Sequence, residues 1–194
     1  MSLASPVFGA DQYAIDPAHT NVGFSVQHLV INRVHGNFTA VSGEILYDEE
    51  DVTRSSVKVV IQTASINTNQ ADRDKHLKSA DFFDAEKYPE ITFQSTKIEK
   101  RDKEGYLCVG TLTMHGVSKE VAIPFEVTGK VKDPRGKTRI GIEANLTLNR
   151  LDYGISWNKA LEGGGLVVGN SVRIALNVEA IKQEAASLKA EERE

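Results

Sequence analysis

The chain has 194 residues, of which 40% are hydrophobic and 26% charged, a composition that is typical of a globular protein and excludes wholesale disorder. Its formal charge of −4, without a cluster of lysine and arginine, argues against nucleic acid or an anionic membrane surface as a partner. No apolar run approaches the roughly 20 residues that a membrane-spanning helix needs, so no integral membrane segment is expected.

Residues 1–12 are interpreted as a leader, 13–182 as one β domain, and 183–194 as a polar C-terminal tail. The leader has neither the basic start nor the apolar core of a signal peptide, so a chain complete as given would be cytoplasmic. The single cysteine, Cys108, excludes an internal disulfide and weakly favours a reducing compartment.

From Tyr13 onward, apolar and polar residues alternate with the period of two that predicts half-buried strands. Pro124 lies inside one such run and predicts an edge, a bulge or a kink. About eight long strands favour an up-and-down antiparallel barrel or a sandwich, and a barrel of that size holds one ligand. The expected strand segments are 13–16, 21–28, 34–47, 57–66, 90–99, 106–115, 120–130, 140–148 and 172–178.

The alternation breaks near residues 72–84, where a short helical insertion is expected. Residues 73–78 are predicted to be helical, because acids precede and open the segment. The paired Phe82 and Phe83 follow, and Pro89 ends any helix before the next strand. The two phenylalanines are expected either to plug the core or to form a lid that faces a ligand.

The sequence contains no recognisable catalytic or metal-binding motif. The five histidines are scattered, and no histidine or cysteine pair has the spacing of metal ligands, so hydrogen-bonded histidines at strand ends are the preferred interpretation. Neither a nucleophile elbow nor a phosphate-binding loop occurs, and the glycines 163–165 are interpreted as a flexible loop. We therefore predict neither catalytic residues nor a metal site.

The predicted inward faces are almost wholly apolar, which suits an apolar guest, although a barrel filled by its own side chains would have the same pattern. These inward residues are Val22, Phe24, Val26, Val59, Ile61, Phe93, Phe125, Ile142, Leu146 and Ile174.

Several segments carry a family resemblance, in the order Tyr13-x-Ile15-Asp16-x-x-His19-x-x-Val22-x-Phe24, Val34-x-Gly36-x-Phe38, RDxHL–DFFDAxxYPxIxFxST over 73–96, Gly110-x-Leu112-Thr113-x-x-Gly116-Val117-x-Lys119, and 149–154. From about Tyr13 to Lys182 the chain resembles the YceI-like family of lipocalin-like polyisoprenoid-binding proteins. The resemblance implies an extended eight-stranded barrel whose tunnel holds an isoprenoid quinone, a polyprenyl phosphate or another amphiphilic lipid. It also implies a non-enzymatic protein that requires no cofactor, a homodimer, and a periplasmic location.

The hypothesis from the sequence is a carrier or store for a long isoprenoid lipid. The tail is expected in a tunnel that also includes Phe38, Phe82 and Phe83, and the head group near Arg73, His76 and the 152–165 loop with Trp157. One rival is a barrel enzyme that uses His28, His76 or His115 as a base on a lipid-like substrate. Another is a structural barrel that is filled by side chains and binds no ligand.

Overall fold

The computed structural model describes residues 9–101, 105–162 and 164–184. The helices within these residues are η1 (Val52–Arg54), η2 (Thr63–Ser65), α1 (Ala71–Lys78) and η3 (Arg150–Tyr153), where η marks a 3-10 helix. The strands are β1 (Asp11–Ile15), β2 (Asn21–His28), β3 (Asn32–Phe38), β4 (Val41–Tyr47), β5 (Ser56–Gln62), β6 (Ile66–Asn67), β7 (Glu90–Lys100), β8 (Tyr106–Met114), β9 (Val117–Lys132), β10 (Thr138–Asn149) and β11 (Val168–Lys182).

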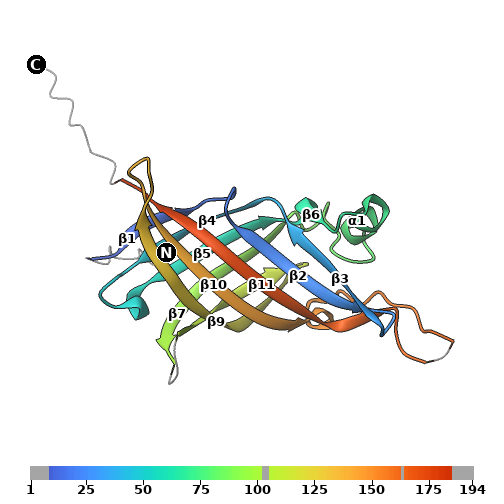
Figure 1. Ribbon diagram of the computed structural model, residues 1–194. Coiled ribbons are helices and arrows are strands. Elements are labelled where there is room, and N and C mark those ends of the chain that lie inside the picture. Colours follow the sequence, from blue (N-terminus) through green and yellow to red (C-terminus); the bar gives the residue numbers. More distant parts are fainter. Residues whose placement is uncertain (1–8, 102–104, 163, 185–194) are drawn as a thin grey trace, which may run out of the picture.

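Eight strands form a closed antiparallel barrel (Figure 1). Their order is β1-β4-β5-β7-β8-β9-β10-β11, and β1 closes the ring by pairing with β11, where Tyr13 lies opposite Lys182 and Ile15 opposite Ala180. The remaining three strands extend the sheet beyond the ring. β2 pairs with residues 168–177 of β11, β3 pairs with β2, and β6 pairs with β3. The expected lipocalin-like barrel with a short helical insertion is therefore confirmed.

Two strand predictions are wrong. The segment 57–66 is not one strand, because β5 ends at Gln62 and the 3-10 helix η2 separates it from β6. The segment 34–47 is two strands, because β3 pairs with β2 whereas β4 pairs with β1 and β5. The segment 11–28, which pairs with β3 and β4, is itself interrupted between β1 and β2, where Pro17 has no amide hydrogen to donate to a ladder. β1 also begins at Asp11, inside the segment that was interpreted as a leader.

The barrel wall is incomplete between β9 and β10. Their ladder joins Phe125–Lys132 to Thr138–Ala144, and the residues before Phe125 pair with β8 alone. In this fully described stretch, residues 117–124 of β9 and 145–149 of β10 form no ladder with each other. Pro124 lies where the β9–β10 ladder begins, in agreement with the irregularity expected there.

The helix of the insertion begins two residues earlier than its predicted start at Arg73, because Gln70 caps α1 by accepting a hydrogen bond from the amide of Arg73. Asp74 accepts hydrogen bonds from the amide and the hydroxyl of Thr68, so the helix is tied to the end of β6. Within the described residues, no helix is both long and apolar enough to cross a membrane.

Three of the best-buried residues, Tyr13, Ile140 and Ala180, lie near the closure of the ring and are almost inaccessible to solvent. This core extends along the barrel to Phe38, Ile66 and Ile91, close to the insertion. A second buried cluster consists of Val52, Phe93, Ile98 and Cys108, which come from η1, β7 and β8.

Candidate functional site

The barrel encloses an apolar cavity of about 110 Å³. Each of the eight strands in the ring contributes at least one lining residue, so the cavity is a product of barrel closure. None of the lining residues carries a carboxylate, an imidazole, an amine or a guanidinium group. They are Ile15, Ile45, Tyr47, Val52, Ser55, Ser56, Val57, Val59, Phe93, Ile98, Cys108, Ile123, Phe125, Val127, Ile142, Ala144, Leu176 and Val178.

The few polar side chains on the cavity wall are hydroxyl and thiol groups. The Ser55 hydroxyl accepts a hydrogen bond of 2.9 Å from the amide of Asp48. Burial raises the pKa of the Cys108 thiol to about 11, and burial also raises the pKa of Tyr47. At neutral pH these groups carry no charge, so the interior favours an uncharged, apolar guest.

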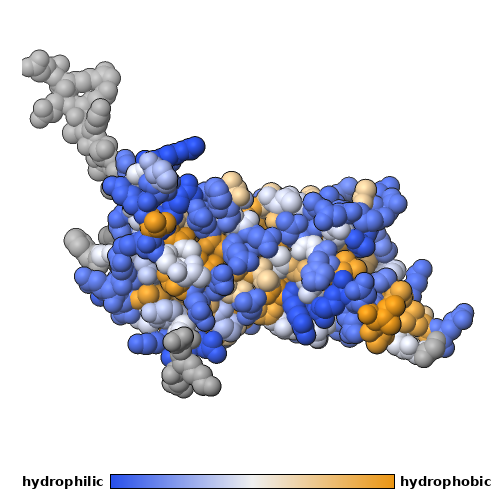
Figure 2. All heavy atoms as spheres, in the orientation of Figure 1, coloured by the Kyte–Doolittle hydropathy of each residue, from blue (hydrophilic) through white to orange (hydrophobic). Residues whose placement is uncertain are grey.

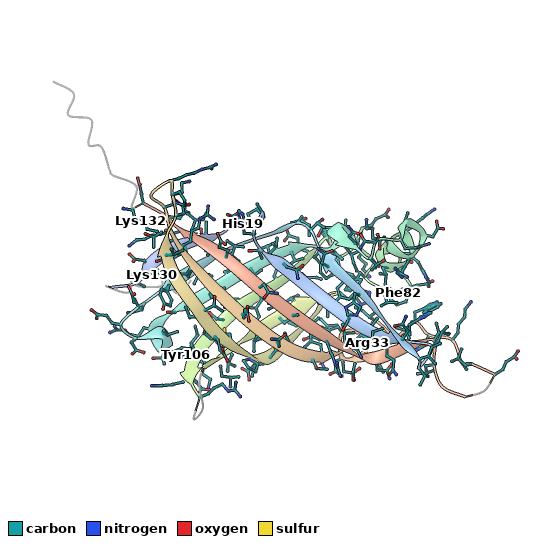
Figure 3. The ribbon with its side chains drawn as sticks, viewed as in Figure 1. His19, Arg33, Phe82, Tyr106, Lys130 and Lys132 are labelled. Carbon is teal, nitrogen blue, oxygen red and sulfur yellow. The ribbon has the colours of Figure 1, made fainter. Side chains whose placement is uncertain are left out.

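A polar mouth lies beside the cavity and shares Tyr47, Val52 and Val127 with it. Lys130 on β9 forms an ion pair with Glu49 across this mouth. Tyr106 also lines the mouth, and Figure 3 shows Tyr106 and Lys130 at the same end of the barrel. As names, we call this end, where β1 pairs with β11, the narrow end, and the opposite end, where β9 and β10 do not pair, the wide end.

Four of the predicted tunnel residues line the cavity, namely Val59, Phe93, Phe125 and Ile142. A further group lies in the adjoining core, where Val22 and Phe38 are buried and Phe24, Ile61 and Phe83 pack against them. Leu146, Ile174 and Phe24 stand in register across β10, β11 and β2. With the half-buried Val26, they extend the apolar inner face beyond the cavity toward the other, wide end.

At the wide end, the structure brings three predicted residues into one aromatic cluster. The ring of Phe82 lies 5.0 Å from His76 and 5.2 Å from Trp157, and His76 lies 4.9 Å from Trp157. His76 Nε2 is also 2.8 Å from Asp81 Oδ2. This cluster joins the insertion to the loop that follows η3, so the two segments contact each other at the wide end.

The other predicted rim and lid residues have internal partners. Arg73 donates hydrogen bonds to the hydroxyl and the carbonyl of Thr68, and so holds α1 against the end of β6. Phe83 packs edge-on against Phe38 at 5.8 Å, and Phe38 in turn lies 5.8 Å from Phe24. Phe83 thus packs toward the barrel core, while its neighbour Phe82 packs toward Trp157.

One of the histidines links two loops. His115 Nδ1 lies 2.9 Å from the Tyr153 carbonyl, which connects the β8–β9 turn to η3. Asp16, His19 and Glu179 lie close enough together to suggest metal ligands. However, the guanidinium of Arg139 already binds Asp16 at 2.7 Å and also pairs with Glu179, so an arginine cation occupies this position.

The alternation of apolar and polar residues that predicts the tunnel also includes most of the cavity-lining residues that the prediction omits. Ile123 and Val127 share the inner face of β9 with Phe125, and Leu176 and Val178 share the inner face of β11 with Ile174. Only the ring order determines which part of each inner face surrounds the cavity.

A model of the YceI-like domain matches residues 13–180. The chain belongs to the YceI-like family. Among its curated relatives, a UPF0312 protein of Vibrio campbellii is 37% identical over 189 residues, which cover 94% of each chain.

Solved structures of similar proteins contain the same YceI-like barrel. The YceI protein of Campylobacter jejuni is 35% identical, with a TM-score of 0.69 over 95% of this chain and all of that one. A polyisoprenoid-binding domain from Saccharophagus degradans, at 16% identity, shares the fold with a TM-score of 0.66 over 88% of this chain and 98% of that one. The YceI-like match covers every cavity-lining residue and the aromatic cluster.

Proposed function

We propose that this protein binds a long isoprenoid lipid, such as a quinone or a polyprenyl phosphate, with the tail inside the barrel. The observation that carries the proposal is a cavity enclosed by all eight strands and lined without a charged group. Burial of each CH₂ group there contributes about 0.8 kcal/mol. The polyisoprenoid-binding domain that shares this fold supports the same class of ligand.

The inner face offers more length than the cavity alone. Along β10, the inward residues run from Ile142 at the cavity to Leu148 near the wide end, which is about 20 Å at the usual rise of a strand. Leu146, Ile174 and Phe24 cross this path in register. A tail that begins in the cavity therefore continues toward the wide end, and we place the head group there, near His76, Trp157 and Arg73.

The cavity volume predicts that the barrel widens when it binds a lipid. Sites for small molecules usually enclose about 300–1,000 Å³, whereas this cavity measures about 110 Å³. The unpaired stretch between β9 and β10 provides a place where the wall separates without loss of ladder hydrogen bonds. Lipid exchange further requires His76, Phe82 and Trp157 to move apart, and this is how a carrier or store would release its guest.

The proposal needs neither a catalytic group nor a cofactor. The histidines of the rival enzyme hypothesis, His28, His76 and His115, are absent from the cavity lining, all of which lies in the described part of the chain. Unaltered lipid recovered from the protein would favour binding over turnover. The homodimer and the compartment stay predictions.

Native mass spectrometry of protein purified without detergent, followed by organic extraction, tests the proposal. We expect a bound mass whose homologues differ by one isoprene unit. Ala144→Leu fills the cavity, so bound lipid should fall at least about tenfold. Ala175→Leu adds the same side chain at an exposed position of β11 and should leave binding unchanged. A lipid-free wild type that takes up no added quinone or polyprenyl phosphate would contradict lipid binding, and unaltered binding by Ala144→Leu would move the site elsewhere.

A further inference from the structure

An exposed apolar projection ends the barrel beyond β2 and β3. It consists of Leu29, Val30 and Ile31 in the β2–β3 turn and Leu166 in the loop before β11, and we call it the apolar tip. Their exposed fractions are 37%, 57%, 86% and 42%, and they make up four of the seven large apolar residues that the described chain exposes. Figure 2 shows apolar atoms gathered at this projecting end, among mainly polar surroundings.

The backbone of the apolar tip is in a conformation that its side chains disfavour. Leu29 and Val30 have φ values of 51° and 64°, and the Ile31 amide donates to the His28 carbonyl across the turn at 3.2 Å. Two consecutive residues with positive φ characterise a hairpin turn that favours Asn-Gly, and a β-branched residue such as valine is rare there. The sequence therefore keeps apolar side chains at a position where they favour neither the turn nor the solubility of the free protein.

The neighbouring loop holds the apolar tip in place. The Leu29 amide donates a hydrogen bond of 2.9 Å to the Val167 carbonyl. Gly165 lies against Val30, since a Cβ at this glycine would be 3.1 Å from the valine methyl carbon. Leu166, between these two contacts, is thereby fixed beside the turn, so the four apolar side chains form one surface.

A polar groove with two arginines lies directly behind the apolar tip, on the outer face of the same strands. Arg33 is the second residue of β3 and lies at this end of the barrel (Figure 3). Two hydrogen bonds to Ser25 hold its guanidinium. Arg173 on β11 lies opposite Ser25 in the register. The groove contains no acidic residue, and its lining is Gln27, Arg33, Thr147, Gly169, Asn170, Ser171 and Arg173.

We propose that the apolar tip docks the barrel onto an anionic lipid bilayer. The aliphatic side chains would enter the interfacial region, and the arginine groove behind them would contact lipid phosphates. A protein interface of standard size needs roughly 800 Å² per partner, whereas the tip is a narrow projection that fits a soft bilayer better. The overall charge of −4 argued against such a surface, but folding brings together two arginines that the sequence keeps far apart.

Docking would place the wide end of the barrel at the membrane. The apolar tip follows β2, whose inward residues Phe24 and Val26 belong to the apolar inner face. η3 and the loop that carries Trp157 lie at this same end, because they connect β10 to β11. This inference goes beyond lipid binding and does not depend on the cargo. The cavity-filling Ala144→Leu variant should therefore dock like the wild type, so a failure of the proposed lipid binding would not be mistaken for a failure of docking.

Flotation with vesicles of phosphatidylcholine and phosphatidylglycerol tests the apolar tip. The double variant Leu29→Asn with Val30→Gly gives the turn its preferred residues, so it should fold at least as well as the wild type. We expect its vesicle affinity to fall at least about tenfold. Val131→Asn removes another exposed valine at the opposite end of the barrel and should not change the affinity. A wild type that does not float, or a double variant that floats equally well, would overturn the proposal.

The role of the groove has a separate readout. Arg173→Gln should remove most of the preference for phosphatidylglycerol and flatten the salt dependence, while Arg135→Gln in the β9–β10 turn should change neither. Equal preference for phosphatidylglycerol in wild type and Arg173→Gln would overturn the role of the groove. If the tip variant turned a dimer into a monomer without loss of vesicle binding, the tip would be a protein interface and docking on membranes would be refuted.

Discussion

Cys108 is a thiol whose reactivity is set by the barrel interior. It lines the cavity, and burial raises its pKa to about 11 from the ordinary value of 9.0. Two pKa units reduce the thiolate fraction near neutral pH about 100-fold. The residue therefore acts as a small apolar group on the cavity wall, in keeping with its lack of a nearby base in the sequence.

We expect Cys108 to react with a small thiol reagent at pH 8 about 100-fold more slowly than a free cysteine, because both burial and the raised pKa protect it. A lipid in the cavity should slow the reaction further, and urea should restore the normal rate. Timed alkylation followed by mass spectrometry measures all three rates. An equal rate with and without lipid would show that the guest lies away from this wall.

At the scale of the elements, the two neighbouring phenylalanines of the insertion have different partners. Phe83 should contribute to global stability, because it packs on Phe38 and the core. Phe82 should control opening of the wide end, because it packs on His76 and Trp157.

Phe83→Ala is expected to lower the free energy of unfolding by about 2–4 kcal/mol. Phe82 is itself buried, so Phe82→Ala should also lower stability, but it should in addition raise the rate of lipid release several-fold, since it loosens the contact between insertion and loop. Urea unfolding and transfer of bound lipid to vesicles separate these effects. If both variants lose equal stability and release lipid at the wild-type rate, the insertion is a core plug rather than a lid.

Local sequence patterns predicted the positions of the strands and the helix better than they predicted which strands pair with each other. The period of two located the strands because it depends only on adjacent side chains, but the change of partner that separates β3 from β4 depends on distant residues. The helix start was missed because Gln70, rather than a more typical Ser, Thr, Asp or Asn, is the N-cap. For the site, the alternation of apolar and polar residues identified the inner face of the barrel. The extent of the cavity depends on the order of the strands in the ring, and the contact of Phe82 with Trp157 depends on residues far apart in the sequence, so neither could be predicted from local patterns.

At the scale of the whole molecule, Arg139 links the first and the last strands of the ring, β1 and β11, at their point of closure. Its guanidinium binds Asp16 after β1 at 2.7 Å and Asp133 in the β9–β10 turn at 2.8 Å, and it also pairs with Glu179 on β11. The hydrogen bonds from His19 and Arg139 lower the pKa of Asp16 to about 2. Arg139 likewise lowers the pKa of Asp133. The ionised carboxylates thus help to hold the barrel closed.

Since these carboxyl groups have lower pKa values in the folded protein, their stabilisation should be complete above about pH 4 and be lost as the pH falls toward 2. Arg139→Gln leaves the acids without their shared cation and should lower the free energy of unfolding at pH 7. The variant should also lose less stability than the wild type between pH 4 and 2. Urea unfolding at three pH values checks this, with the exposed Arg135→Gln as control, and parallel pH profiles for wild type and Arg139→Gln would contradict it.

The pairing of β1 with β11 also determines when the barrel is completed. During synthesis the first strand emerges long before the last, and every intermediate chain presents an open, apolar inner face. The ring closes only after residues 180–182 have been made, which is a contact of high sequence separation and therefore a late event in folding. If the protein binds lipid as proposed, a lipid present at that moment would be enclosed as the final strand joins the first, and would enter without any opening of a finished barrel.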